Sequence, residues 1–187
     1  IMPNILILGA TGSLAREVIA TAARNPALHL TLFARNPRNL PTQYPVISGD
    51  ALDPAALQAA MAGQDIVYVN LAGDLARMGA NIVAAMQATG VRRVIAISSI
   101  GIYTTPLPDI LRPYRALADG IEQSGLDYTI LRPDWFTNAD EIDYQLTPKD
   151  KPECGSAVSR KSIADFVCKL FADPAQYIGA NLNISKP

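Results

Sequence analysis

The chain has 187 residues, 49% of them hydrophobic, a length that suits one domain burying about 70% of its unfolded surface. With 16 basic and 17 acidic residues, the net charge is −1, which gives no electrostatic basis for binding nucleic acid or an anionic membrane. We therefore expect a small-molecule substrate, with no nucleic-acid or membrane partner.

Few residues suit a metal centre or a disulfide framework. His29 is the only histidine, and Cys154 and Cys168 are the only cysteines, which is too few for the usual zinc ligand set. We expect no metal and two reduced thiols. The N-terminal residues lack the parts of a secretory signal, and no apolar run is long enough to span a bilayer. These features predict a cytoplasmic protein.

Apolar runs typical of buried strands alternate with helical patterns along the chain. Strands are expected at residues 5–8, 28–34, 44–48, 66–71, 91–97, 128–131 and 182–184. Helices are expected through residues 18–22, at 54–61, continuing through 81–89, at about 114–123 and near 162–171. This alternation predicts an α/β fold, namely a doubly wound parallel sheet with crossover helices.

The chain shows no internal repeat and no linker long enough to separate two domains. We expect a single domain over residues 1–187. Polar and turn residues dominate residues 138–157, and residues 134–158 form a small C-terminal, substrate-side loop region in this prediction. Ligands of open α/β sheets bind at the carboxyl ends of the strands, and we expect this region to lie over those ends.

The first strand leads directly into a turn of small residues and then into a helical pattern. Gly9 permits a sharp turn, and Gly12 lets the backbone come close to a diphosphate, which the N–H groups and dipole of the following helix stabilise. The strand before and the helix after are the context that this motif requires. The candidate diphosphate-binding residues are Gly9, Thr11, Gly12, Ser13 and Leu14.

The second strand ends in Arg35, with Arg38 three residues later, where NAD-binding proteins of this fold carry an acidic residue. A guanidinium fork suits a ribose 2′-phosphate, and no acidic residue occurs between Glu17 and Asp50. NADP(H) is therefore predicted in preference to NAD(H). The alternative that both arginines are solvated surface residues stays open.

Further cofactor candidates follow the other strands, and topology alone places them. Asp50 and Ala51 are expected near the adenine, and the residues after the fourth strand are expected near a ribose; each group could instead be a simple strand-end turn. The remaining candidates are Asn70, Leu71, Ala72, Ser98 and Pro133.

Five segments together resemble the atypical short-chain dehydrogenase/reductases, in particular their NAD(P)-binding, NmrA-like group. They are residues 9–12, 49–50, 94–99, 124–133 and 159–165. The run at 124–133, Ser-Gly-Leu-Asp-Tyr-Thr-Ile-Leu-Arg-Pro, is more particular than the glycine motif, which many enzymes share. The resemblance implies a Rossmann-type sheet that binds NADP(H), often with oxidoreductase activity.

The resemblance also implies catalytic residues, Ser99 after the fifth strand and Tyr103 close behind it, facing the nicotinamide and the substrate. Catalytic members of the wider superfamily pair a tyrosine with a lysine four residues later, and no tyrosine of this chain has one. Whether Arg112 or Arg115 supplies the missing positive charge is left open, as is whether Trp135 packs or roofs a substrate pocket.

The first hypothesis is an NADPH-dependent oxidoreductase that reduces a small carbonyl, a quinone or a similar acceptor. The alternative is a non-catalytic NADP(H)-binding redox sensor of NmrA-like type, which acts on a regulatory protein partner. A third hypothesis, a nucleotide-sugar epimerase or dehydratase, generally needs the Tyr–Lys pair and a larger substrate domain. A homodimer is left open, because apolar periodicity in the helices equally serves packing on the sheet.

Overall fold

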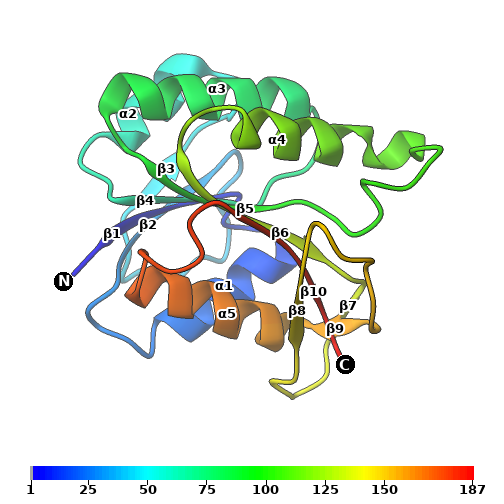
Figure 1. The fold of residues 1–187 in the computed structure, drawn as a ribbon. Coiled ribbons are helices and arrows are strands. Elements are labelled where there is room, and N and C mark those ends of the chain that lie inside the picture. Colours follow the sequence, from blue (N-terminus) through cyan, green and yellow to red (C-terminus); the bar gives the residue numbers. More distant parts are fainter. Residues whose placement is uncertain (1) are drawn as a thin grey trace.

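An eight-stranded sheet forms the centre of the computed structural model, which describes residues 2–187 (Figure 1). The strand order is β3-β2-β1-β4-β5-β6-β10-β8, and neighbouring strands are parallel except β8, which is antiparallel to β10. Ile1, with which the expected domain begins, lies outside the described residues. The predicted α/β, doubly wound parallel architecture is confirmed.

The strands of the large sheet are β1 (Asn4–Leu8), β2 (His29–Ala34), β3 (Val46–Ser48), β4 (Ile66–Val69), β5 (Arg93–Ile97), β6 (Asp127–Pro133), β8 (Gln145–Pro148) and β10 (Ala180–Ser185). Two further strands, β7 (Phe136–Thr137) and β9 (Val158–Ser159), pair with each other in parallel.

The helices are α1 (Ser13–Ala22), α2 (Pro54–Met61), α3 (Leu75–Thr89), α4 (Arg112–Glu122) and α5 (Arg160–Ala172), and a short 3-10 turn (Asp109–Leu111) precedes α4. Helices α1 and α5 pack side by side on one face of the sheet, and α2, α3 and α4 cover the other face (Figure 1).

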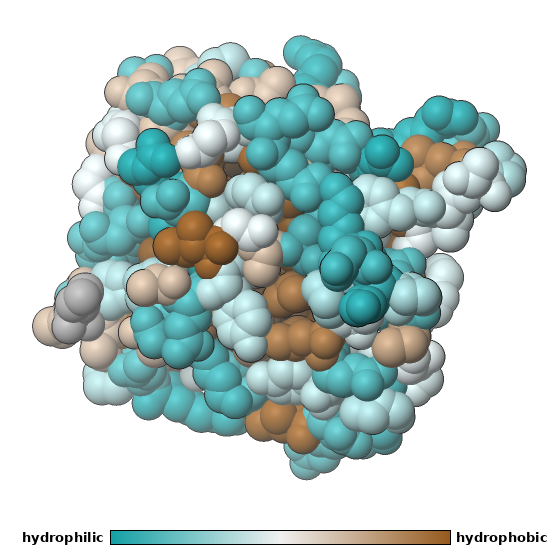
Figure 2. Space-filling view, in the orientation of Figure 1, coloured by the Kyte–Doolittle hydropathy of each residue, from teal (hydrophilic) through white to brown (hydrophobic). Residues whose placement is uncertain are grey.

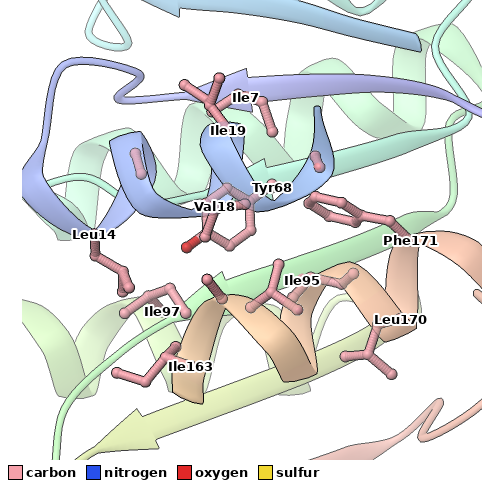
Figure 3. Close-up of a cluster of buried hydrophobic side chains, with 14 of the residues drawn as sticks. Ile7, Leu14, Val18, Ile19, Tyr68, Ile95, Ile97, Ile163, Leu170 and Phe171 are labelled. Carbon is pink, nitrogen blue, oxygen red and sulfur yellow. The ribbon is translucent and has the colours of Figure 1, made fainter. Parts of the chain in front are cut away.

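The layer between α1, α5 and the sheet is a closely packed apolar core (Figure 3). Residues Ile5 to Leu8 of β1 are fully buried, because a central parallel strand is covered on both faces. The rings of Tyr68 and Phe171 meet edge to face at 5.8 Å between centroids, which joins β4 to α5. This packing fixes the start of α5 beside the start of α1.

Helix α3 begins at Leu75 and contains residues 81–89, which were expected to continue a helix. Asp74 caps it by accepting a hydrogen bond from the Arg77 amide. A Cβ at Gly79 would stand 3.0 Å from Leu117 of α4, so the glycine that interrupts the helical pattern serves the close packing of α3 on α4.

The region 134–158 differs from the loop expected there, because it contains β7, β8 and β9. Strand β8 extends the edge of the large sheet, and only part of the region reaches the carboxyl ends of the strands. Within residues 2–187, no helix combines the length and the apolarity needed to cross a membrane. Figure 2 shows a face on which hydrophobic residues stand in small groups among polar ones.

Candidate functional site

The N-terminus of α1 is left open by the protein. Gly12 occupies the cap position in an extended conformation and provides no side-chain hydrogen bond, and the first turn contains no acidic residue. By contrast, Asp53, Asp74 and Ser159 cap α2, α3 and α5 with their side chains. The unpaired amides and the positive dipole end of α1 therefore fit an anion such as a diphosphate.

Gly9 makes the turn before α1 possible. Its φ of +84° lies in the left-handed region, and a Cβ at this position would stand 2.1 Å from the Asn70 carbonyl oxygen. The amides of Gly9 and Ala10 both donate to the Phe33 carbonyl at the end of β2. The turn is thus held between the ends of β2 and β4, where only glycine fits.

Arg16 fixes this turn to the loop that follows β2. Its Nε donates to the Thr11 carbonyl at 3.0 Å, and its two Nη groups donate to the carbonyls of Asn39 and Arg38 at 2.7 and 2.8 Å. Sequence analysis missed this residue, since an arginine on a helix gives no signal of which distant carbonyls it will meet.

A cleft of about 430 Å³ lies beside this turn at the carboxyl ends of the strands. It brings together most of the candidates predicted from the sequence: Gly9, Thr11, Gly12, Ser13, Leu14, Arg35, Asp50, Ala51, Asn70, Leu71, Ala72 and Ser98. Met78, Ile97, Tyr114 and Phe136 also line it and were not singled out. Ile97 ends a strand whose position was predicted, whereas no local signal marks Phe136.

Arg35 reaches the cleft at the end of β2 and is exposed. Within residues 2–187 its side chain makes no ion pair and no hydrogen bond to another side chain, so its guanidinium donors are available to a ligand. Asp50 also lines the cleft, and its carboxylate accepts the Leu52 amide, which shapes the turn after β3.

Two candidates at the ends of β5 and β6 are held by the protein itself. The Ser98 hydroxyl donates to the Tyr114 carbonyl at 2.9 Å, so it faces the cleft with its proton already engaged. Pro133 does not line the cleft, and its carbonyl accepts the Ile100 amide.

The two predicted catalytic residues do not line the cleft either. The Ser99 hydroxyl donates to the Ile100 carbonyl, and the Tyr103 hydroxyl accepts a hydrogen bond from Asn181 of β10 at 2.8 Å. Asn181 is in register with Ile130, three residues or roughly 10 Å before the carboxyl end of β6. The Tyr103 hydroxyl is therefore directed away from the cleft, and a catalytic role for the pair stays a prediction.

Cations from three parts of the chain surround the Tyr103 ring. The guanidinium carbons of Arg115 and Arg132 lie 4.9 and 5.2 Å from the ring centroid, and the Lys149 ammonium lies 4.8 Å from it. The Lys149 ammonium also bonds Glu122, and this bond raises the pKa of the lysine. Of the two arginines considered in the sequence, Arg115 thus contacts Tyr103.

Arg132 is buried beneath this ring and links β6 to the loop after β8. It forms an ion pair with Glu153, and its Nε donates to Asn181. The other carboxylate oxygen of Glu153 accepts the Gly101 amide. We call Tyr103, Arg132, Glu153 and Asn181 the Tyr103 cluster. Its polar groups are directed at one another, except the Arg132 Nη2, which is buried without a hydrogen-bond partner among the described residues.

Arg112 and Trp135, whose roles the sequence left open, do not line the cleft. The Arg112 guanidinium pairs with Asp109 at 2.9 Å on the exposed turn before α4, and Trp135 is 80% exposed and does not line the cleft. Trp135 therefore does not pack in the core.

Comparison with known proteins agrees with this geometry. Residues 9–174 match the family described as NAD(P)H-binding. The chain belongs to that family. The resemblance to the atypical short-chain dehydrogenase/reductases is likewise confirmed.

Two solved structures match essentially the whole chain. A Rossmann-fold NAD(P)-binding family protein from Shigella flexneri is 46% identical, with a TM-score of 0.91, and the match covers 100% of this chain and 95% of that one. A short-chain dehydrogenase/reductase from Veillonella parvula, solved in complex with NADP, is 27% identical, with a TM-score of 0.90 and coverage of 100% and 96%.

A relative of described activity matches more distantly. The (4-alkanoyl-5-oxo-2,5-dihydrofuran-3-yl)methyl phosphate reductase of Streptomyces griseus subsp. griseus is 32% identical over 136 residues, which cover 71% of this chain and 48% of the relative. The match therefore spans about half of the length of that relative.

Proposed function

We propose that the protein is an NADPH-dependent oxidoreductase that reduces a small carbonyl, quinone or similar acceptor. One observation carries the proposal: the open N-terminus of α1 and the unpaired Arg35 face the same cleft at the carboxyl ends of the strands. An anion site and a second cation on one wall suit a dinucleotide with a diphosphate and a 2′-phosphate.

In this proposal the residues of the chain bind and orient the cofactor. The unpaired amides at the start of α1 hold the diphosphate, Arg35 holds the 2′-phosphate, and Asp50 with Ala51 borders the adenine. Asn70, Leu71 and Ala72 border a ribose. The apolar Ile97 and the ring of Phe136 exclude water from the other end of the cleft. When bound, reduced nicotinamide supplies a hydride to the acceptor.

Neither Tyr103 nor Ser98 offers a free proton at the cleft, and this bears on the acceptor. Tyr103 bonds Asn181, and Ser98 bonds a backbone carbonyl, so we propose no acid–base step through either residue. An acceptor protonated by solvent after hydride transfer, such as a quinone, suits this site better than an unactivated ketone.

The test is titration with NADPH and NADH, followed through nicotinamide fluorescence, and then addition of quinones, aldehydes and flavins. Tighter binding of NADPH with turnover of an acceptor would support the proposal. Equal affinity for the two nucleotides would contradict the role of Arg35.

The position of Tyr103 also favours a second candidate, a non-catalytic NADP(H)-binding redox sensor of NmrA-like type. A sensor needs the cofactor cleft but no proton donor. Tight NADPH binding without turnover on any acceptor would favour the sensor, and no binding would exclude both functions.

A further inference from the structure

Arg160, the first residue of α5, stands beside the open start of α1. Its Nε donates to the Ser13 hydroxyl at 3.1 Å, and its Nη1 donates to the Asn138 side-chain oxygen at 2.7 Å. Ser13 lines the cleft and begins α1. One hydrogen bond therefore separates the Arg160 guanidinium from the proposed diphosphate site.

The same guanidinium contacts a second residue of the cleft lining, although Arg160 itself lies just outside that lining. It lies 5.2 Å from the centroid of the Phe136 ring, and Phe136 lines the cleft. Phe136 belongs to β7, which pairs with β9 through Val158, two residues before Arg160. Arg160 thus joins the start of α1 to residues 136–138 beside the cleft.

The charge of Arg160 is not neutralised by the protein. Within residues 2–187 it makes no ion pair, whereas the adjacent Lys161 pairs with Asp140. Both acceptors of Arg160, a hydroxyl and an amide oxygen, are uncharged. A guanidinium with neutral partners can exchange one of them for a phosphate oxygen and form a stronger, charge-assisted bond.

We propose that Arg160 is a further cofactor-binding residue, which neutralises the diphosphate of the bound dinucleotide and holds residues 136–138 against it. This inference depends on the proposed function. Arg160 serves the diphosphate that NADPH and NADH share, whereas Arg35 serves the 2′-phosphate that only NADPH carries. The effects of substituting the two arginines can therefore be distinguished by comparing the binding of NADPH with that of NADH.

The first experiment measures the dissociation constants of NADPH and NADH for the unaltered protein and for Arg160→Ala. We expect both constants to rise by the same factor, about tenfold or more, because a bond to a charged group is lost. The dependence of binding on salt should weaken, since one cation facing the ligand is removed. Lys161→Ala is the matched control and should bind both nucleotides within about twofold of the unaltered protein, because its ammonium is committed to an exposed pair.

Adenosine 2′-monophosphate, which has the 2′-phosphate but no diphosphate, makes the test specific. Used as a competitor, it should bind Arg160→Ala as it binds the unaltered protein and should bind Arg35→Ala more weakly. Weaker binding of this ligand to Arg160→Ala would contradict a role confined to the diphosphate.

A purely structural role for Arg160 makes a different prediction. Asn138→Ala removes one tether of the guanidinium but keeps its charge, so it should weaken nucleotide binding less than Arg160→Ala does. Equal effects of the two variants, with unchanged salt dependence, would overturn the inference. Should Arg160→Ala fail to fold, Arg160→Gln keeps a hydrogen-bond donor without the charge and gives the same comparison.

Trp135, the single tryptophan, adjoins Phe136 and reports on the second part of the inference. Saturation with NADP⁺ should change its emission in the unaltered protein, and the change should be smaller in saturated Arg160→Ala. Unchanged affinity in Arg160→Ala would overturn this inference alone. Lack of binding by the unaltered protein would overturn the proposed function and this inference with it.

Discussion

The cleft and the Tyr103 cluster are both rich in polar groups, but they use them in opposite ways. At the cleft, the α1 amides and the Arg35 guanidinium have no side-chain partners within residues 2–187. In the cluster, Arg132 bonds both Glu153 and Asn181, and Asn181 bonds Tyr103. Polar groups left open at a strand end indicate ligand binding, whereas polar groups that satisfy one another indicate architecture.

Of the substitutions considered, Gly9→Val should have the largest effect on stability and on nucleotide binding at the cleft. The new Cβ would collide with the Asn70 carbonyl, and the valine would have to adopt the left-handed backbone conformation. Together these effects cost about 3 to 4 kcal/mol of stability. Nucleotide binding should be lost. Gly120→Ala is the control, because a Cβ there meets nothing within 4 Å and alanine stabilises a helix interior. Thermal unfolding and NADPH titration measure both effects, and normal binding by Gly9→Val would contradict the proposed site.

Arg132→Met should destabilise the Tyr103 cluster without weakening nucleotide binding at the cleft. Removing one member of a buried pair leaves Glu153 without its cation, and we expect a loss of about 2 to 3 kcal/mol. Lys149→Ala, which removes a half-exposed pair, should cost less than about 1 kcal/mol. Urea unfolding compares the two variants. If folded Arg132→Met bound NADPH poorly, the cluster would not be separate from the cleft.

Arg35→Ala should change only the choice of nucleotide. Loss of bonds to the 2′-phosphate is expected to weaken NADPH binding about 10- to 100-fold and to leave NADH binding unchanged. Arg92→Ala, at an exposed arginine before β5, is the control and should change neither constant. Equal weakening of both nucleotides would mean that Arg35 does not recognise the 2′-phosphate.

Tyr103→Phe is a smaller change to the Tyr103 cluster than Arg132→Met. The Asn181 amide loses one acceptor but keeps Glu122 within 3.3 Å, so we expect a loss of about 1 kcal/mol and unchanged NADPH affinity and turnover. If turnover collapsed while stability held, Tyr103 would be a catalytic residue after all.

Alkylation of the cysteines should have the smallest effect. Burial raises the pKa of Cys168 to about 12, so little of the reactive thiolate forms at pH 8, whereas Cys154 is exposed. One equivalent of a thiol reagent should react, at Cys154, without altering NADPH binding. Mass spectrometry identifies the modified residue. Two equivalents reacting in the folded protein would contradict the burial of Cys168.

Most of the fold and of the cofactor cleft could be predicted from the sequence because their signals are local. Buried strands appear in the sequence as apolar runs, and the residues that follow parallel strands lie at the same edge of the sheet. The structure brings Gly9, Asp50 and Asn70, which this reasoning selected, to the same cleft.

What sequence analysis missed depends on contacts between distant segments. Arg16, Phe136 and Arg160 act through groups far away in the chain, and nothing near them signals this. Strand β8 carries little apolar pattern and is defined by its pairing with β10. For Tyr103, the family pattern predicted a place at the nicotinamide, but the bond to Asn181 directs its hydroxyl elsewhere.

The two edge strands of the large sheet affect whether copies of the protein aggregate. Its outer strands are β3, with only three residues, and β8, which ends at Pro148 and is followed by Lys149. Short edges, proline and lysine discourage another strand from adding to a sheet. The fold can thus maintain a wide parallel sheet at high concentration without offering a template for edge-to-edge aggregation.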